Sequence, residues 1–332
     1  MDTYSHRERV EMILAGEKPD RFAASFWRHF YHMEHHAEGT IEAMVAFQKQ
    51  FDWDFMKINP RADYHVQDWG KKIEYSHDEF TNHRKVGFPI QSAEDWSRIE
   101  PLRMSAPNLT EHLKVVSKIR KAVGRDLPVL MTVFTPLSLA GRLVPDYATM
   151  VAYLRKAPEK VIPALTAITE TFAEYVVELR NAGADGLFYA TTHWASSDLL
   201  TWEEYQRFGI PYDLKVLDGL DDEALNLLHV CDPNNYLKQL VAYDYKARLY
   251  NWDSSNPTNP PVDQAYDLLD GKTIVGGVDD KGWLLQAGAE EVGYQMEQLA
   301  KRHDPARVIL GPDCAIAPET PMENLKAVRD RL

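Results

Sequence analysis

The residues best suited to chemistry lie in the stretch LNLLHVCDP, residues 225–233. His229 and Cys231 stand two positions apart at the end of an apolar run, and in an extended strand residues i and i+2 point to the same side. The imidazole and the thiol are therefore predicted to share one face. Cys314, the other of only two cysteines, ends a second apolar run, RVILGPDC, where a strand would again give way to a loop.

One imidazole and two thiols are donors that zinc prefers, and three protein ligands leave a fourth position for a reacting group. The sequence thus indicates a zinc site made of His229, Cys231 and Cys314. The alternative is that the cysteines are buried small apolar side chains, which is how a free cysteine usually behaves. Short spacings such as H-x-C recur by chance, so the residues alone leave both interpretations open.

Composition narrows the class of protein. The chain has 332 residues, of which 45% are hydrophobic and 26% charged, as is typical of a soluble globular protein with a sizeable core. A net charge of −13 without a basic stripe argues against a nucleic-acid partner, which needs clustered cations. No apolar run approaches the roughly 20 residues that cross a bilayer, so no membrane partner is expected. The polar start lacks the apolar segment of a secretory signal, and a cytoplasmic location is expected.

Strand-like and helix-like segments alternate along the chain. A capping box at Ser5 and Glu8 predicts a first helix at 6–15. Eight apolar segments are predicted as strands, namely RFAASFWRHF, DFMKINP, LPVLMTVF, GLFYATTHW, EALNLLHVCD, ARLYNWD, KTIVGGVD and ARVILG. The later helices are expected at 40–51, 108–123, 136–143, 147–156, 159–181, 202–217, 234–242, 262–269, 289–303 and from 323 onward.

Strands that alternate with helices in this number predict a parallel (β/α)8 barrel, the TIM barrel, with an N-terminal helical extension. The polar stretch 61–92 lacks a helical period and is predicted to be an inserted hairpin or lid. A single domain is expected over residues 1–332. A doubly wound open sheet is the alternative, but no G-x-G-x-x-G follows a strand, so nothing indicates a dinucleotide fold.

Barrel active sites lie at the carboxyl ends of the strands, where the histidine and both cysteines are predicted to converge. Asp232, directly after the ligand strand, is expected to cap a helix that begins near residue 234 rather than to orient a histidine. Packing and polar turns are the alternative roles for the remaining residues at strand ends. Two of these are catalytic candidates and five are candidate substrate contacts: Arg28 and His193, then Trp27, Tyr31, Tyr189, Trp194 and Asp279.

Several segments resemble the uroporphyrinogen decarboxylase superfamily, which also contains zinc methyltransferases that act with methyl-corrinoids. They are RERVEMILAGEKPDR, SFWRHF, GGVDDKG and above all GPDCAIAPETPMENLKAVRD, and the resemblance covers nearly the whole chain. The true decarboxylases carry an arginine-rich motif after the first strand and an Asp after the second. This chain has FWRHFYHM, with Arg28 alone, and Asn59 in place of the Asp. One arginine cannot clamp a substrate with eight carboxylates as several can.

The branch similar to methylcobamide:coenzyme M methyltransferases carries H-x-C after an inner strand and a Cys in the last strand's loop. His229, Cys231 and Cys314 match these positions. The resemblance implies zinc at these residues and methyl exchange with a corrinoid on a partner protein, since no corrinoid-binding module is visible. The small substrate is either a thiol acceptor, anchored by Arg28 or Lys57, or an aryl methyl ether donor. The alternatives are a uroporphyrinogen decarboxylase-like enzyme and a non-catalytic zinc-binding relative.

Overall fold

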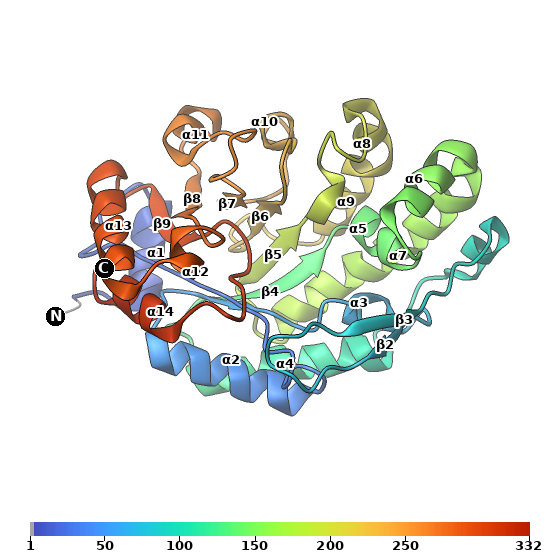
Figure 1. Cartoon of the computed structure of the whole chain (residues 1–332). Helices are drawn as coiled ribbons and strands as arrows, with labels where there is room; N and C mark the ends of the chain where they lie inside the picture. Colours follow the sequence, from blue (N-terminus) through green and yellow to red (C-terminus); the bar gives the residue numbers. More distant parts are fainter. Residues whose placement is uncertain (1–2) are drawn as a thin grey trace.

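The computed structural model describes residues 3–332. Its centre is a curled sheet of seven parallel strands in the order β1-β4-β5-β6-β7-β8-β9, with helices outside it (Figure 1). The predicted barrel-type α/β architecture is confirmed. The strands are β1 (Met56–Ile58), β4 (Val129–Phe134), β5 (Gly186–Ala190), β6 (Leu227–Val230), β7 (Leu249–Trp252), β8 (Thr273–Val278) and β9 (Val308–Pro312).

The eighth strand position is taken by an irregular extended segment, residues 23–28. Backbone hydrogen bonds join it to Leu310 in β9 on one side and to Asp54, just before β1, on the other. Only isolated bridges form, at Ala24 and Arg28, because the Ala24 N–H donates to the Asp54 carboxylate at 2.8 Å instead of to a strand carbonyl. The predicted first strand is therefore at the correct position, but the segment is not a regular β-strand. The segment still connects both edges of the sheet.

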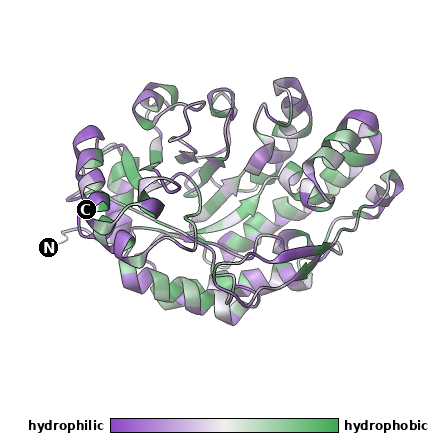
Figure 2. Cartoon of the chain, viewed as in Figure 1, coloured by the Kyte–Doolittle hydropathy of each residue, from purple (hydrophilic) through white to green (hydrophobic). Residues whose placement is uncertain are grey.

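Helices surround the sheet, and their outward surfaces are hydrophilic whereas the strands are apolar (Figure 2). None of the helices in residues 3–332 is both long and apolar enough to span a membrane. The α-helices are α1 (His6–Leu14), α2 (Ala37–Phe51), α3 (Tyr64–Gln67), α4 (Pro107–Val123), α5 (Pro136–Arg142), α6 (Tyr147–Lys156), α7 (Pro158–Asn181), α8 (Trp202–Phe208), α9 (Ile210–Leu217), α10 (Leu237–Leu240), α11 (Val262–Leu268), α12 (Trp283–Gln286), α13 (Ala289–Arg302) and α14 (Met322–Arg329). Two 3-10 helices, η1 (Ala93–Arg98) and η2 (Thr192–Trp194), complete the set.

Two predicted helices differ from those observed. The segment 202–217 is divided into α8 and α9 at Gly209, where a Cβ atom would lie 2.7 Å from the Tyr205 ring. The segment 234–242 is helical only in α10. Asp232 and Asn234 have φ angles of 69° and 51°, and this left-handed backbone cannot start a right-handed helix.

The insertion predicted at 61–92 contains an antiparallel hairpin of β2 (Lys72–Glu74) and β3 (Arg84–Gly87). The contacts that hold it against the barrel include two hydrogen bonds. At its base, Lys71 Nζ donates to the backbone oxygen of Arg142 at the end of α5. In its connecting loop, Glu79 accepts a hydrogen bond from Arg28 Nη2 at 2.8 Å. The hairpin therefore reaches from α5 to the carboxyl end of segment 23–28.

Apolar side chains fill the interior of the barrel. Leu227 of β6 belongs to this layer, and His229 points to the same side two residues further toward the carboxyl end. The His229 ring packs 5.0 Å from the Phe188 ring. The histidine thus stands directly on an apolar floor. That floor is made of Trp27, Phe55, Leu130, Phe188, Leu227, Leu249, Val275 and Ile309.

Candidate metal centre

His229, Cys231 and Cys314 meet at the carboxyl ends of β6 and β9. The two sulfur atoms are 3.9 Å apart, and Cys314 Sγ lies 3.8 Å from His229 Nε2. All three donor atoms lie within 4.8 Å of one another. In residues 3–332 no other group of three or more His, Cys, Asp or Glu side chains is spaced to hold a metal ion. The structure therefore brings together the three residues that the sequence paired with zinc.

The spacing fits three tetrahedral ligands of one ion. Bonds of about 2.3 Å to sulfur and about 2.0 Å to nitrogen separate two tetrahedral sulfurs by about 3.8 Å, and sulfur from nitrogen by about 3.6 Å. The observed distances of 3.9 Å and 3.8 Å agree with these values. A disulfide would need sulfurs about 2.05 Å apart, and both cysteines are free. The donor set and its geometry fit a zinc ion.

Asn251 fixes the orientation of the His229 ring. Its amide nitrogen donates to the backbone oxygens of Val275 at 2.7 Å and Pro312 at 3.0 Å. The amide oxygen therefore faces His229 Nδ1, 2.5 Å away, and accepts its proton. This hydrogen bond leaves a lone pair on Nε2, which is directed toward Cys314, and it selects the tautomer that a metal-binding histidine needs.

The sequence analysis missed Asn251. It lies in β7 directly beside His229 in the parallel register and is fully buried. The available signal was an asparagine inside the apolar run RLYNW. A buried amide in a strand is costly unless it is hydrogen-bonded, so such a residue indicates a specific partner.

The two thiols differ in their tendency to ionise. The hydrogen bond from the Cys231 thiol lowers the pKa of Cys314 well below its usual range, and the nearby His229 adds to this effect. The same hydrogen bond, with burial, raises the pKa of Cys231. Two negative charges this close repel each other, so one thiol ionises readily and the other does not. A bound cation would favour both thiolates.

Two other buried ionisable groups interact electrostatically with Cys314. Lys57 Nζ lies 4.4 Å from the centre of the Phe188 ring and contacts Asn59 Oδ1, and burial lowers the pKa of Lys57 to about 7. Asp280 follows β8, and burial, with the charge of Cys314, raises its pKa to about 7. Both groups therefore exchange protons near neutral pH. The sequence suggested Lys57 only as an anchor for a thiol substrate.

His193 and Asp232 form a hydrogen-bonded pair beside Cys231. His193 Nδ1 contacts the Asp232 carboxylate, and its ring centre lies 4.9 Å from that of Tyr147. The left-handed backbone of Asp232 turns its side chain toward His193 and away from α10. The expectation that Asp232 caps a helix is wrong for this reason. The carboxylate instead holds His193 with its Nε2 atom available to a ligand.

Three further candidates lie around segment 23–28. Arg28 is buried and its backbone pairs with Ile316, two residues beyond Cys314, while its Nη1 atom has no hydrogen-bond partner within residues 3–332. Trp27 packs in the barrel floor against Phe188, with ring centres 5.4 Å apart. Tyr31 is further out and stacks on His29. The backbones of Trp27 and Arg28 thus both adjoin Ile316 in the loop that carries Cys314.

Two other candidates make hydrogen bonds of their own away from the three metal-type ligands. Tyr189 points out of the barrel and its hydroxyl donates to the Asp213 backbone oxygen at 3.2 Å, because the alternation of β5 turns Phe188 inward. Asp279 accepts a hydrogen bond from the Gly282 N–H at 2.7 Å and closes its own turn. The position of Tyr189 does not agree with the expectation that it contacts substrate, whereas a substrate contact by Asp279 stays a prediction.

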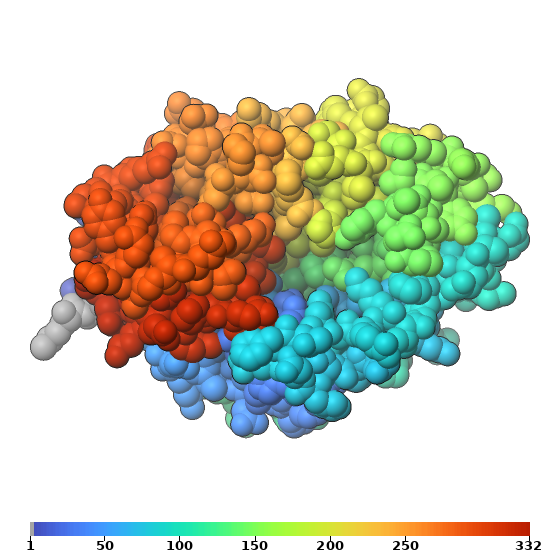
Figure 3. Space-filling view, in the orientation of Figure 1, coloured from blue at the N-terminus to red at the C-terminus, as the bar shows by residue number. Residues whose placement is uncertain are grey.

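The barrel mouth is open to solvent. In Figure 3 the surface is hollowed between the C-terminal part of the chain, in orange and red, and the insertion, in cyan. Parallel α/β barrels bind their ligands at this end, where the loops after the strands meet. The fold and the His–Cys–Cys group together define an α/β barrel protein with a candidate metal centre at the carboxyl ends of its strands.

The family model for uroporphyrinogen decarboxylase (URO-D) matches residues 9–332. The chain belongs to the uroporphyrinogen decarboxylase family. This agrees with the resemblance seen in the sequence.

Relatives within the family carry two kinds of name. Methylcobamide:CoM methyltransferase MtbA of Methanosarcina acetivorans is 23% identical over 247 residues, which are 71% of this chain and 67% of that protein. Uroporphyrinogen decarboxylase of Synechococcus sp. is 30% identical over 248 residues, 72% of this chain and 67% of that protein. A solved structure described as a methyltransferase from Methanosarcina mazei superposes with a TM-score of 0.79 at 19% identity and covers 98% of both chains. The superposition supports the same fold over the whole chain.

Proposed function

We propose that this protein is a zinc-dependent methyltransferase that exchanges a methyl group between a corrinoid on a partner protein and a small substrate. The observation that carries the proposal is the group of His229, Cys231 and Cys314, with the histidine already oriented by Asn251. The relatives named methylcobamide:CoM methyltransferase support the corrinoid as the second reactant.

In this proposal His229 Nε2 and the sulfurs of Cys231 and Cys314 hold the zinc. When bound, zinc would supply a Lewis acid for the sulfur or oxygen atom of the substrate. Cys231 and Cys314, as thiolates, would offset the charge of the ion. The apolar floor below the histidine excludes water from that side.

Nearby residues of the chain handle the proton. A thiol substrate must lose its proton before its sulfur can accept a methyl group. Lys57 Nζ interacts electrostatically with both cysteines and has a pKa of about 7, so its neutral form can take up a proton at neutral pH. Asp232 holds His193 Nδ1, and His193 Nε2 is then free to contact the substrate.

Two substrate classes fit the proposal. A thiol acceptor is supported by the relative named methylated-thiol–coenzyme M methyltransferase from Methanosarcina mazei, which is 24% identical over 217 residues. An aryl methyl ether donor, in an O-demethylase reaction, is supported by the aromatic side chains of Tyr147 and Trp194 near the mouth. Methyl exchange with a corrinoid is common to both.

The second candidate function is decarboxylation of a porphyrinogen, and the Synechococcus relative supports it. Too few arginines are present to bind the carboxylates of a porphyrinogen in this way. Arg28 is the single arginine in the stretch FWRHFYHM, and one of its nitrogens is already bonded to Glu79. Decarboxylation also gives no role to the His–Cys–Cys group.

Elemental analysis and a spectral assay test the proposal together. The protein is expected to contain about one zinc per chain. The zinc-loaded protein is then offered methylcobalamin with thiols, or cob(I)alamin with methoxyarenes, and the corrinoid spectrum is followed. A spectral change in either direction supports methyl exchange. Zinc without any spectral change would leave a non-catalytic zinc-binding protein, and a protein that cannot bind zinc would contradict the proposal entirely.

A further inference from the structure

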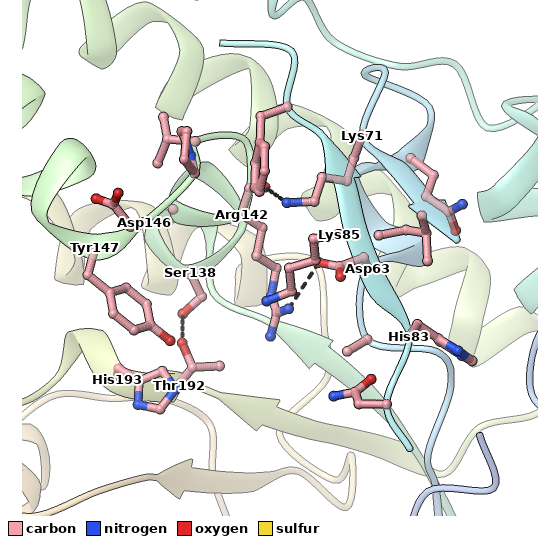
Figure 4. A pocket seen from close by; sticks show the side chains of 18 of the residues that line it. Asp63, Lys71, His83, Lys85, Ser138, Arg142, Asp146, Tyr147, Thr192 and His193 are labelled. Atoms are coloured by element: carbon pink, nitrogen blue, oxygen red, sulfur yellow. Dashed lines mark hydrogen bonds and ion pairs between the residues drawn. The ribbon is translucent and has the colours of Figure 1, made fainter. Parts of the chain in front are cut away.

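A cavity of about 350 Å³ lies beside the metal centre, between the inserted hairpin, α5 and η2 (Figure 4). Three cationic side chains line it. Lys71 and Lys85 come from the insertion, and Arg142 ends α5. Figure 4 shows these three side chains approaching one another around Asp63.

The cations outnumber the carboxylate that they share. Arg142 Nη1 donates to Asp63 Oδ1 at 3.1 Å, and Lys71 Nζ donates to the Arg142 backbone oxygen at 2.7 Å. Lys85 makes no side-chain hydrogen bond or ion pair with any residue from 3 to 332, and the same holds for Nη2 of Arg142. The second carboxylate in the lining, Asp146, already caps α6. Donors thus remain free in the cavity.

The pKa of Lys71 reflects its burial beside two other cations. It is 4% exposed and its Nζ atom lies 3.6 Å from the centre of the Phe88 ring. Burial lowers the pKa of Lys71 to about 8, and the charges of Lys85 and Arg142 act in the same direction, against Asp63. Positive groups held together in a partly buried site favour an anion that joins them.

The opposite wall of the cavity is aromatic. The rings of Tyr147 and Trp194 are 5.6 Å apart at their centres, and His193 packs on Tyr147. Gly141 of α5 permits this arrangement, because a Cβ atom there would lie 2.4 Å from the Trp194 ring. The cavity therefore has a cationic side and a flat aromatic side.

The aromatic wall connects the cavity with the metal centre. His193 lines the cavity and contacts the Asp232 carboxylate, and Asp232 follows Cys231 in the chain. A molecule that lies against Tyr147 and His193 therefore extends toward the three metal-ligating side chains.

We propose that this cavity binds a small acid with a flat body, whose carboxylate or sulfonate contacts Lys71, Lys85 and Arg142. Its body lies against Tyr147 and Trp194, and its methylated or methyl-accepting end points toward Cys231. The three cations are then specificity-determining residues. The statement about the reacting end depends on the proposed function. The statement that the cavity binds an anion does not depend on it.

Calorimetric titration of the full-length protein tests the anion site with matched probes. The probes are 4-methoxybenzoate, 4-methoxybenzenesulfonate and the neutral 4-methoxybenzamide. Each charge-assisted contact is worth roughly a factor of ten or more in affinity, so we expect at least one of the two anions to bind at least tenfold more tightly than the amide. Arg142→Met and Lys85→Met should each remove most of that preference. Lys215→Met, on the exposed face of α9, should not change it.

The outcomes separate the anion site from the proposed function. Equal affinity for the anions and the amide, or an unchanged preference in Arg142→Met and Lys85→Met, would overturn the anion site. Unfolding curves identify any variant that fails to fold, and Arg142→Lys, which keeps the charge, should restore part of the preference. Cys314→Ser should lose zinc and still bind the preferred anion. Anion binding by a protein without zinc or methyl exchange would sink the proposed function alone.

Discussion

The two ends of the barrel treat buried charge in opposite ways. At the amino end, Asp54 is fully buried and accepts hydrogen bonds from Arg9 Nη1 at 2.7 Å, Arg21 Nη1 at 2.8 Å and the Ala24 N–H at 2.8 Å. Asp185, just before β5, likewise pairs with Arg7 at 2.8 Å and with other donors. Every carboxylate oxygen of this cluster has donors around it.

At the carboxyl end, buried donors lack acceptors. Arg28 Nη1 and Asn59 Nδ2 are buried without a hydrogen-bond partner in the part of the chain that the structure describes. Lys57 is buried with a lowered pKa, and the sulfur atoms of Cys231 and Cys314 lie 3.9 Å apart.

The difference separates stability from function. Native proteins satisfy nearly all buried polar groups, so a satisfied network is what a structural role requires. Among the buried polar atoms without a partner in residues 3–332, Arg28 Nη1 and Asn59 Nδ2 lie toward the end where barrels bind ligands, and a ligand can complete them there. The comparison predicts that substitutions at the amino end change folding and that substitutions at the carboxyl end change binding.

The largest effect is expected from the metal ligands. Cys231→Ser and Cys314→Ser should each lower zinc affinity by more than about 100-fold, beyond the loss seen for residues that only support a ligand. Zinc per chain after dialysis measures this loss. Asp279→Asn is the matched control, because Asp279 follows a strand but closes its own turn. Full zinc occupancy in both cysteine variants would place the metal elsewhere.

The next effect concerns stability. Asp54→Asn removes the charge that Arg9 and Arg21 share, and breaking a buried ion pair costs about 3–5 kcal/mol of unfolding free energy. Denaturant unfolding measures it. Zinc per folded chain should stay at the wild-type value. Asp52→Asn, more than half exposed nearby, should have a much smaller effect. An Asp54→Asn protein that keeps its stability and loses zinc would contradict the assignment of stability to the amino end and binding to the carboxyl end.

The stability of the protein at low pH should depend on the same carboxylates at the amino end of the barrel. Burial raises the pKa of Asp54, but hydrogen bonds from His6 and Arg21 exceed that effect and hold it below its usual value. The Arg9 hydrogen bond lowers the pKa of Asp20 as well. Their stabilisation is therefore complete above the unfolded value, about 4, and is lost progressively as the pH falls from there toward the lower folded-state pKa values. Unfolding curves between pH 7 and pH 3 should show a shallower loss in Asp54→Asn than in the wild type.

A smaller effect on metal binding is expected from Asn251→Ala. The variant loses the acceptor that orients His229, and such supporting residues usually contribute 10- to 100-fold in metal affinity, so we expect a loss of about that size. A chelator competition measures zinc affinity. Asn226→Ala is the control from the other end of the barrel, since Asn226 is equally buried and accepts from the Leu187 N–H at 3.0 Å. It should lower stability without changing zinc affinity.

The last prediction is that one reaction, the decarboxylation of uroporphyrinogen, does not occur. Uroporphyrinogen should not be decarboxylated at a useful rate, because Arg28 stands alone where the decarboxylases have several arginines and is paired with Glu79. A turnover assay with product separation checks this. Accumulation of coproporphyrinogen would contradict it and favour the second candidate function.

Much of the site follows from local patterns in the sequence. The period of two in a strand places His229 and Cys231 on one face, and parallel strands bring their carboxyl ends, and hence Cys314, together. The same rule failed for Tyr189, because every residue of GLFYA is buried and an apolar strand does not reveal which side faces inward.

Other site residues depend on contacts that no local pattern encodes. Asn251 matters because the register of β6 and β7 sets it beside His229. Lys71, Lys85 and Arg142 converge only because the hairpin docks against α5. Asp232 pairs with His193 because of a left-handed backbone that the sequence HVCDP does not disclose.

The irregular segment 23–28 closes the barrel with fewer backbone hydrogen bonds than a regular strand would make, and we call this closure the seam. Its two isolated bridges replace a full ladder, and one of its amides depends on the Asp54 carboxylate. Local opening costs least where few backbone hydrogen bonds must break. The amide of Ala24 should therefore exchange with solvent deuterium earlier than those of the central strands β5 and β6. Since Arg28 pairs with Ile316 in the loop that carries Cys314, an opening of the seam would release that cysteine while the rest of the barrel stays folded.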